Sequence, residues 1–395
     1  MKMKRIYLDN SATTQLKPEV LDVMIEALKN HNFNAASAHS YGQEGKLDLA
    51  KARETIANFV GAEPREIYFT SGGTESDNWA VHIAKKTKKG KHMITTTVEH
   101  HAMLHTMEEA QKEGYDVTFL PVDEYGLVTA KQVEEALRED TILISILYGN
   151  NEIGTVMPIE EIGAVAKAHN ILFHTDAVQA VGNVPLDLSN STIDMMSFSA
   201  HKIYGPKGIG SLFIRKTVRP YAFIHGGAQE RGYRGGTDNL PSIMGFAKAC
   251  ELAGENLAGH ISRLTTLRDK LIHGILERVP HCKLNGHPTK RLPGNVNISF
   301  EFIEGESILL MLDMTGIAAS SGSACTSGSL DPSHVLMGIG LSHEIAHGSL
   351  RMTLGDFTRE EDIDYVLEKL PPIIQRLREM SPLYEEEMRK QNGNV

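Results

Sequence analysis

Short apolar segments alternate with longer helical patterns through much of the chain, and this alternation constrains the fold most. Segments that read as strands lie at residues 67–70, 93–97, 117–120, 142–148, 171–174, 193–198 and 209–214. Strands that alternate with helices in this way predict an α/β fold with a mostly parallel seven-stranded sheet wrapped by helices. Because ligands of such sheets bind at the carboxyl ends of the strands, polar residues that follow these segments are candidate site residues.

The length of 395 residues exceeds what one small hydrophobic core accommodates and predicts two domains. We expect a large domain over residues 15–258. A smaller α+β domain would combine residues 1–14 with residues 259–395, including strands near 295–300 and 349–353. A long helical pattern over residues 241–279 would carry the chain between them. We expect the charged tail after Tyr384 to fray.

The composition narrows the class of protein. An apolar content of 41% and a charged content of 23% are ordinary for a globular protein, and the net charge of −10 argues against nucleic acid as a partner. No apolar run is long enough to span a membrane, and the N-terminus lacks the apolar region of a signal peptide. Three widely spaced cysteines (Cys250, Cys282 and Cys325) form neither a disulfide framework nor a zinc pattern. A cytoplasmic protein with a thiol available for chemistry is the expectation.

A lysine and an aspartate follow two of the predicted core strands. Lys202 comes after the strand at 193–198, and Asp176 follows the strand at 171–174. Burial lowers the pKa of a lysine, which suits Schiff-base chemistry. Pyridoxal 5′-phosphate (PLP) requires such a lysine and a carboxylate near its pyridinium nitrogen. A lysine on a surface turn is the plainer interpretation, but the paired aspartate favours a PLP site.

Two further loops fit the same cofactor. The glycine turn at residues 71–73 runs from a strand into a helix, where free backbone N–H groups favour a phosphate. Thr74 is expected to cap this helix. His100 follows the strand at 93–97 and could stack on a cofactor ring, although alone it would read as a capping or surface histidine.

A run of small and polar residues surrounds the third cysteine. Residues 320–329 cannot pack a core, so we expect a flexible loop there, with Cys325 as a reactive thiol. The alternative is an incidental loop cysteine. The segment His343-Glu344-Ile345-Ala346-His347 also matches the zinc-protease pattern HExxH. The extended form of that pattern is missing, so we interpret this match as a helix start and expect no metal site.

Taken together, these motifs resemble group I cysteine desulfurases, the NifS/IscS family within the class V aminotransferase branch of fold-type I PLP enzymes. The resemblance covers nearly the whole chain. Its motifs are YLDNSATT at 7–14, TSGGTESD at 70–77, NNEIG at 150–154, HTDAVQAVG at 174–182, RLPGN at 291–295, IEGES at 303–307, SGSACTSGS at 321–329 and AHGSLR at 346–351. The chain departs from the family at Ser11, at residues 32–37 and at His101.

The resemblance implies roles for individual residues. Lys202 would hold PLP and move the Cα proton of L-cysteine, Asp176 would keep the pyridine nitrogen protonated, and Cys325 would take the sulfur as a persulfide. Arg351 with Asn151 would bind the substrate carboxylate. The remaining cofactor contacts would come from Gly73, Thr74, His100, Gln179, Ser199, Ala200, His201 and, from the other subunit of a homodimer, Thr237.

The resemblance also implies partners. The sulfur acceptor would be an iron–sulfur scaffold or a sulfur-carrier protein, and Cys325 could bridge a cluster transiently. Alternatives within the same class are a selenocysteine lyase or another class V PLP enzyme. A zinc protease built on His343, Glu344 and His347 is the alternative from a different class.

Overall fold

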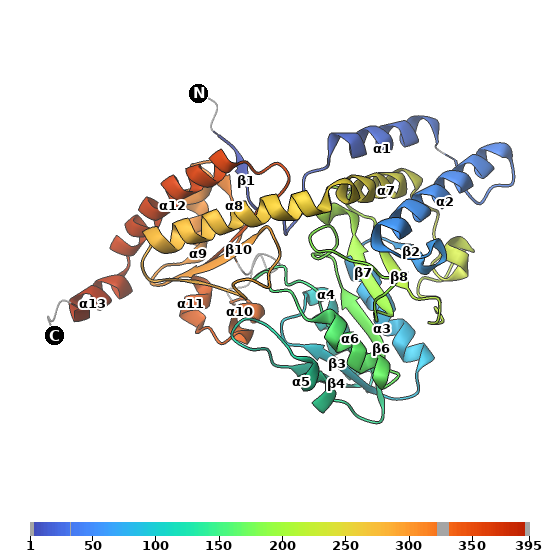
Figure 1. The fold of residues 1–395 in the computed structure, drawn as a ribbon, viewed down its shortest axis with the longest axis horizontal. Helices are drawn as coiled ribbons and strands as arrows, with labels where there is room; N and C mark the ends of the chain where they lie inside the picture. Colours follow the sequence, from blue (N-terminus) through green and yellow to red (C-terminus); the bar gives the residue numbers. More distant parts are fainter. Residues whose placement is uncertain (1–3, 32, 322–331, 392–395) are drawn as a thin grey trace.

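The computed structural model describes residues 4–31, 33–321 and 332–391, which form two adjoining parts (Figure 1). The larger part is built on a seven-stranded sheet with the strand order β2-β8-β7-β6-β5-β3-β4. Its strands are β2 (Ile67–Thr70), β3 (His92–Thr96), β4 (Asp116–Leu120), β5 (Thr141–Ser145), β6 (Leu172–Asp176), β7 (Met195–Ser199) and β8 (Gly210–Ile214). Only β8 runs antiparallel to its neighbours, so the prediction of a mostly parallel seven-stranded sheet is confirmed.

Helices cover both faces of this sheet because successive strand residues point to opposite sides. On β7, Met195 packs with the buried residues of α3 and α4, whereas Met196 belongs to the core under α2, α6 and α7. The helices and short 3-10 turns of this part are α1 (Pro18–Asn30), α2 (Ser40–Val60), η1 (Pro64–Glu66), α3 (Gly73–Thr87), α4 (His101–Lys112), α5 (Ala130–Glu135), α6 (Ile159–Ala168), η2 (Ala200–Lys202), η3 (Gln229–Gly232) and α7 (Leu240–Glu255).

The smaller part contains a three-stranded antiparallel sheet and a two-stranded parallel sheet. Its strands are β1 (Ile6–Tyr7), β9 (Cys282–Leu284), β10 (Asn295–Phe300), β11 (Ile317–Ala318) and β12 (Ser349–Thr353). Its helices are α8 (Leu257–Arg278), α9 (Gly305–Met314), α10 (His334–Gly338), α11 (His343–His347), α12 (Glu360–Glu379) and α13 (Pro382–Gln391). Ile6 and Leu8 lie in the core of this part, so the first residues of the chain pack with its C-terminal third.

Three local expectations from the sequence are wrong. The helical pattern over 241–279 is two helices, because Asn256 leaves the helical conformation and its side chain caps α8 by accepting from the Gly259 N–H at 3.2 Å. The described part of the tail after Tyr384 belongs to α13 rather than to a frayed end. Thr74 does not cap α3, because the helix begins at Gly73 and its N-cap is Gly72, whose φ of 157° suits glycine.

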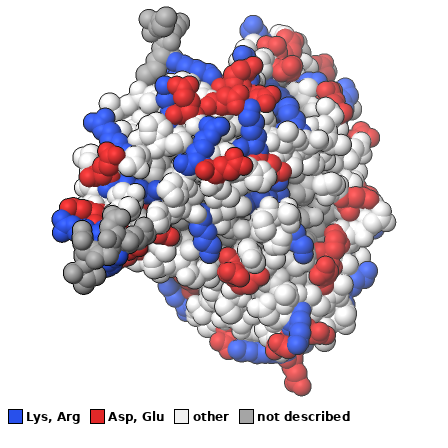
Figure 2. Space-filling model, turned by 60° about the vertical axis from the view of Figure 1, so that its left-hand side comes forward, with Lys and Arg blue, Asp and Glu red and all other residues white. Residues whose placement is uncertain are grey.

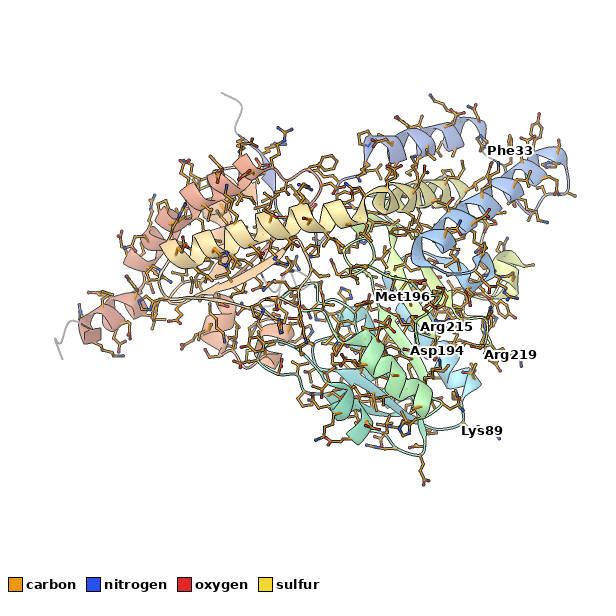
Figure 3. The ribbon with its side chains drawn as sticks, in the orientation of Figure 1. Phe33, Lys89, Asp194, Met196, Arg215 and Arg219 are labelled. Atoms are coloured by element: carbon orange, nitrogen blue, oxygen red, sulfur yellow. The ribbon has the colours of Figure 1, made fainter. Side chains whose placement is uncertain are left out.

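The amino end of the parallel strands lies away from the candidate site. Asp194 precedes β7 and Arg215 follows the antiparallel β8, so both mark this end of the sheet (Figure 3). The Arg215 N–H donates to the Asp194 carbonyl at 2.8 Å, and Asp194 in turn accepts from the Phe173 N–H at 3.0 Å. The carboxyl ends of β5, β6 and β7 lie at the opposite edge of the sheet, where Arg351 of the smaller part lines the same cavity as Asp176.

Acidic and basic side chains are mixed over the surface. On the face shown in Figure 2, blue and red side chains lie interspersed over the described residues. None of the helices formed by the described residues has the length and apolar character that a membrane crossing requires.

Candidate active site

A cavity of about 310 Å³ lies at the carboxyl ends of β5, β6 and β7 and is closed on one side by the smaller part. It collects most of the residues that the sequence singles out. They are Gly73, Thr74, His100, Asn151, Asp176, Gln179, Ser199, His201, Lys202 and Arg351. Ala200 is buried behind the lining, Thr237 is exposed elsewhere on the surface, and Cys325 lies outside the described residues.

Lys202 reaches the cavity because β7 ends at Ser199 and the short turn η2 follows directly. Its Nζ donates to the carbonyl oxygens of Ser11 and Ala12, the latter at 2.8 Å. The N-terminal turn therefore forms a wall of the site. Sequence reasoning gave no role to Ser11 and Ala12, although they stand inside the motif at residues 7–14.

Two buried carboxyl groups line the same cavity. Asp176 ends β6, and its Oδ1 accepts from the Val178 N–H at 2.9 Å. Burial raises the pKa of Asp176, while the backbone donor and the Lys202 cation lower it. Asp77, from α3, is fully buried and neither of its oxygens has a hydrogen-bond partner among the described residues. Burial, together with the Asp176 charge, raises the pKa of Asp77 well above its usual range.

A neutral histidine lies close to these acids. His174 is completely buried on β6 between the Ser145 hydroxyl at 2.8 Å and the Ser197 hydroxyl at 2.9 Å. Burial lowers the pKa of His174 to about 3, so its ring is uncharged at neutral pH. Its Nε2 lies 3.6 Å from Asp77 Oδ1. This end of the site therefore combines buried acids with an uncharged imidazole.

His100 stands at the N-cap of α4, where its Nδ1 accepts from the Ala102 N–H at 3.1 Å. Burial and the nearby Lys202 cation lower the pKa of His100 to about 4. The neutral ring therefore carries its proton on Nε2. The preceding Glu99 is fully buried and accepts from the Leu147 N–H at 3.0 Å, and burial raises the pKa of Glu99 to about 8.

The opposite side of the cavity is shaped for an anion. A second space of about 480 Å³ shares Gly73, Thr74, Ser199 and His201 with this lining and is also lined by Ser71, Gly72, Glu75 and Lys207. The N-terminus of α3 points its free N–H groups here. A Cβ on Gly73 would lie 2.7 Å from Val178 Cγ2, so any larger residue at this position would force the Val178 side chain to shift.

Arg351, on β12, supplies the guanidinium of the site. It is 2% exposed; its Nη2 lies 2.9 Å from Asp9 Oδ1 and its Nη1 donates to the Asn151 carbonyl at 3.3 Å. Arg351 Nε has no hydrogen-bond partner among the described residues. Glu152 lies near this guanidinium and accepts from the Ser333 hydroxyl. Neither Asp9 nor Glu152 was recognised from sequence as part of this arrangement.

The HExxH match forms the short helix α11, with the rings of His343 and His347 4.5 Å apart. Glu304 lies 3.8 Å from His347. Within residues 4–31, 33–321 and 332–391, no group of three or more His, Cys, Asp or Glu side chains is arranged to hold a metal ion.

Comparison with known proteins defines the class. Residues 6–366 match the family described as aminotransferase class-V. A protein of Clostridium botulinum (strain Hall) named cysteine desulfurase IscS is 53% identical over 391 residues, which is 98% of each chain. Another of that name, from Methanosarcina thermophila, is 53% identical over 388 residues, covering 98% of this chain and 96% of the relative.

Solved structures agree with this result. A structure titled NifS-like protein aligns with a TM-score of 0.88 at 39% identity, covering 95% of this chain and all of the other. A structure titled SspA in complex with cysteine aligns with a TM-score of 0.79 at 37% identity, covering 90% of this chain and all of the other. The chain belongs to the class-V aminotransferase family. Within that family it is similar over its full length to cysteine desulfurases, so the fold expected from the resemblance is confirmed.

Proposed function

We propose that this chain is a PLP-dependent cysteine desulfurase that converts L-cysteine into L-alanine and leaves a persulfide on Cys325. The observation that carries the proposal is that Lys202, Asp176 and Arg351 line one cavity of about 310 Å³. An amine, a buried carboxylate and a guanidinium around a cavity of this volume suit an aldehyde cofactor and an amino acid substrate. The cysteine desulfurases at 53% identity support the same activity.

The residues present fit PLP. Lys202 Nζ would be the amine for the cofactor aldehyde, Asp176 would bind the ring nitrogen, and the α3 N-terminus with Ser199 and His201 would hold the phosphate. Asp77 adds a second buried carboxyl group to the same lining. When bound, PLP supplies an electron sink for the bond changes at Cα of the substrate.

The chain's own residues then place and move protons. Lys202 Nζ takes the proton from Cα of the substrate, and its carbonyl contacts at Ser11 and Ala12 keep the amine at the cavity wall. His100 is neutral because its pKa is lowered to about 4, so its ring can pack on the cofactor without adding a charge beside Lys202. Gln179, which lines the same cavity and donates to the Ser11 carbonyl at 2.9 Å, would bind the ring oxygen.

Sulfur moves from the substrate to the protein in a single transfer step, and this step needs no added oxidant. The Cys325 thiolate attacks the sulfur of the substrate, an S–S bond forms, and the Cβ–S bond breaks. The electron pair of the broken bond stays on the carbon side and is protonated, which gives alanine. The thiolate, and not the thiol, is the nucleophilic form of cysteine in this attack.

We further propose a homodimer, in which Thr237 of one subunit reaches the phosphate of the other. The exposed position of Thr237, outside the cavity of its own chain, supports this reading. The persulfide sulfur would pass to an iron–sulfur scaffold or a sulfur carrier, with Cys325 as a possible transient cluster ligand. Persulfide relay requires free thiols, which fits a reducing cytoplasm.

The test combines absorbance with product analysis. The purified protein, supplied with PLP, L-cysteine and a reductant, is expected to be yellow and to form alanine and sulfide. Cys325→Ser should keep the absorbance but form no alanine, whereas the matched control Cys282→Ser should match the unmodified protein. Normal alanine formation by Cys325→Ser would sink the proposal. Turnover of L-selenocysteine but not of L-cysteine would favour the lyase alternative.

A further inference from the structure

We infer that Asp9 is a positioning residue that fixes the direction of the Arg351 guanidinium and, through it, the binding of the substrate α-carboxylate. The inference rests on the proposed function, because that function assigns the carboxylate end of the substrate to Arg351. Asp9 does not line the cavity itself, whereas Ser11 and Ala12 of the same turn do. It acts on the substrate only through Arg351.

The backbone of Asp9 is held firmly against β12. Asp9 pairs with Thr353, and the Thr353 N–H donates to the Leu8 carbonyl at 2.7 Å. The Asp9 carbonyl accepts from the Tyr7 hydroxyl and from the Ala12 N–H, both at 3.0 Å. Because these hydrogen bonds fix the main chain of Asp9, the fold itself sets the direction of the Asp9 side chain before any ligand binds.

The guanidinium is bound at two of its three nitrogens. Asp9 Oδ1 accepts from Nη2 at 2.9 Å, and the Asn151 carbonyl accepts from Nη1 at 3.3 Å. Arg351 Nε is buried and has no partner among the described residues. A buried N–H without an acceptor is unfavourable, so this edge is the one that a carboxylate would complete. Asp9 thereby determines which edge of Arg351 is left for the substrate.

Asp9 is also the close charge partner of this guanidinium. The side chain of Arg351 is 3% exposed, and a buried cation needs a nearby anion. Glu152 is the other acid close by, but burial raises its pKa to about 7, so a share of it is uncharged at neutral pH. The carboxylate that contacts Arg351 directly is that of Asp9, from the opposite end of the sequence.

The test compares Asp9→Ala with Asp9→Asn in the PLP-loaded protein. Asp9→Ala lets the guanidinium turn, so we expect the KM for L-cysteine to rise roughly 10- to 100-fold while kcat stays within about threefold. Asp9→Asn keeps an oxygen acceptor in the same place and should restore KM to within about fivefold. Lys4→Ala, which removes the Lys4–Asp362 ion pair from the same N-terminal segment, is the matched control and should leave KM unchanged.

Cysteamine separates positioning from general damage, because it is cysteine without the carboxylate. Its binding, followed by the absorbance of the bound cofactor, should be equal in Asp9→Ala and in the unmodified protein. Asp9→Ala should also add little to the KM defect of Arg351→Ala, as expected for two residues that act together. An equal loss of cysteamine binding, or full additivity, would overturn the role of Asp9. Failure of the unmodified protein to form alanine would instead contradict the proposed function.

Discussion

The two ends of the candidate site balance their charges in different ways. Around Lys202, the buried acid Asp77 has no hydrogen-bond partner within the described residues, and Lys202 donates to backbone carbonyls. Around Arg351, the guanidinium already has a carboxylate at 2.9 Å. The first end holds polar groups that a cofactor would complete. The second is largely assembled by the protein and leaves one edge for a small anion.

The two ends also differ in how the chain builds them. Asp176 ends β6 and Lys202 follows β7, and these strands are paired neighbours in one sheet, so the cofactor end depends on a single rigid element. The carboxylate end joins the N-terminal turn, the loop after β5 and strand β12. Substitutions at the cofactor end should therefore abolish chemistry, whereas those at the carboxylate end should mainly weaken substrate binding.

The largest effect is expected for Lys202→Ala. In the proposed mechanism this amine holds PLP and moves the Cα proton, so its removal should lower alanine formation by at least about 10³-fold. The absorbance of the bound cofactor should change as well. Lys216→Ala, on a surface ion pair with Glu63, is the control with unchanged turnover. If Lys202→Ala were active and kept the absorbance spectrum of the unmodified protein, Lys202 would not belong to a cofactor end of the site, and the comparison of the two ends would fail.

Asp176→Ala should have the next largest effect. In the proposed mechanism Asp176 binds the ring nitrogen and its loss weakens the electron sink, so we expect kcat to fall by about 10²-fold or more, with a smaller change in KM. Steady-state kinetics with saturating PLP measures both. If KM rose while kcat stayed constant, Asp176 would belong to the binding end of the comparison and not to the chemical end.

Arg351→Lys tests the carboxylate end. Lysine keeps the positive charge but lacks the planar fork that holds a carboxylate in one direction, so KM for L-cysteine should rise about tenfold or more. The kcat should change less than it does for Asp176→Ala. The contrast between the two ends would fail if Arg351→Lys lowered kcat as strongly as Asp176→Ala does.

The smallest effect concerns stability and pH. Burial raises the pKa of Glu99 from its usual 4.5 to about 8, so between about pH 4.5 and 8 the folded state of the cofactor-free protein keeps a proton that the unfolded state has lost. Stability should therefore fall as pH rises through this window, by at most about 1.4 kcal/mol per pH unit for this one group. Glu99→Gln, which cannot ionise, should show a flatter dependence of the unfolding midpoint on pH. An identical pH dependence in both proteins would show that Glu99 ionises normally.

The sequence was most informative where neighbouring strands carry the chemistry. Apolar segments marked the strands, and parallel pairing then brought Asp176 and Lys202 to one edge. The link between Asp9 and Arg351 joins residues 342 positions apart, and no local pattern indicates which distant acid pairs with which arginine. Such contacts follow from how β12 packs against the N-terminal segment, which only the three-dimensional fold defines.

Local conformation limited the sequence analysis in two other places. Asn256 interrupts an otherwise continuous helical pattern, because an asparagine can either continue a helix or cap the next one. Thr74 resembled a helix cap, but the glycine two residues earlier already turns the chain into α3. Asp77, three residues after Thr74, is a buried group in the cavity.

The burial of two cysteines has a practical consequence for labelling. Cys250 is completely buried, and desolvation raises its pKa well above the usual range. Cys282 is half-buried, its Sγ donates to the Val279 carbonyl at 3.0 Å, and burial raises its pKa too. An alkylating dye that reacts with thiolates near neutral pH should therefore spare both. If Cys325 is the reactive thiol that the proposed function requires, the dye taken up per chain would count that residue alone, and fluorescence would report how much of a sample carries a free acceptor thiol.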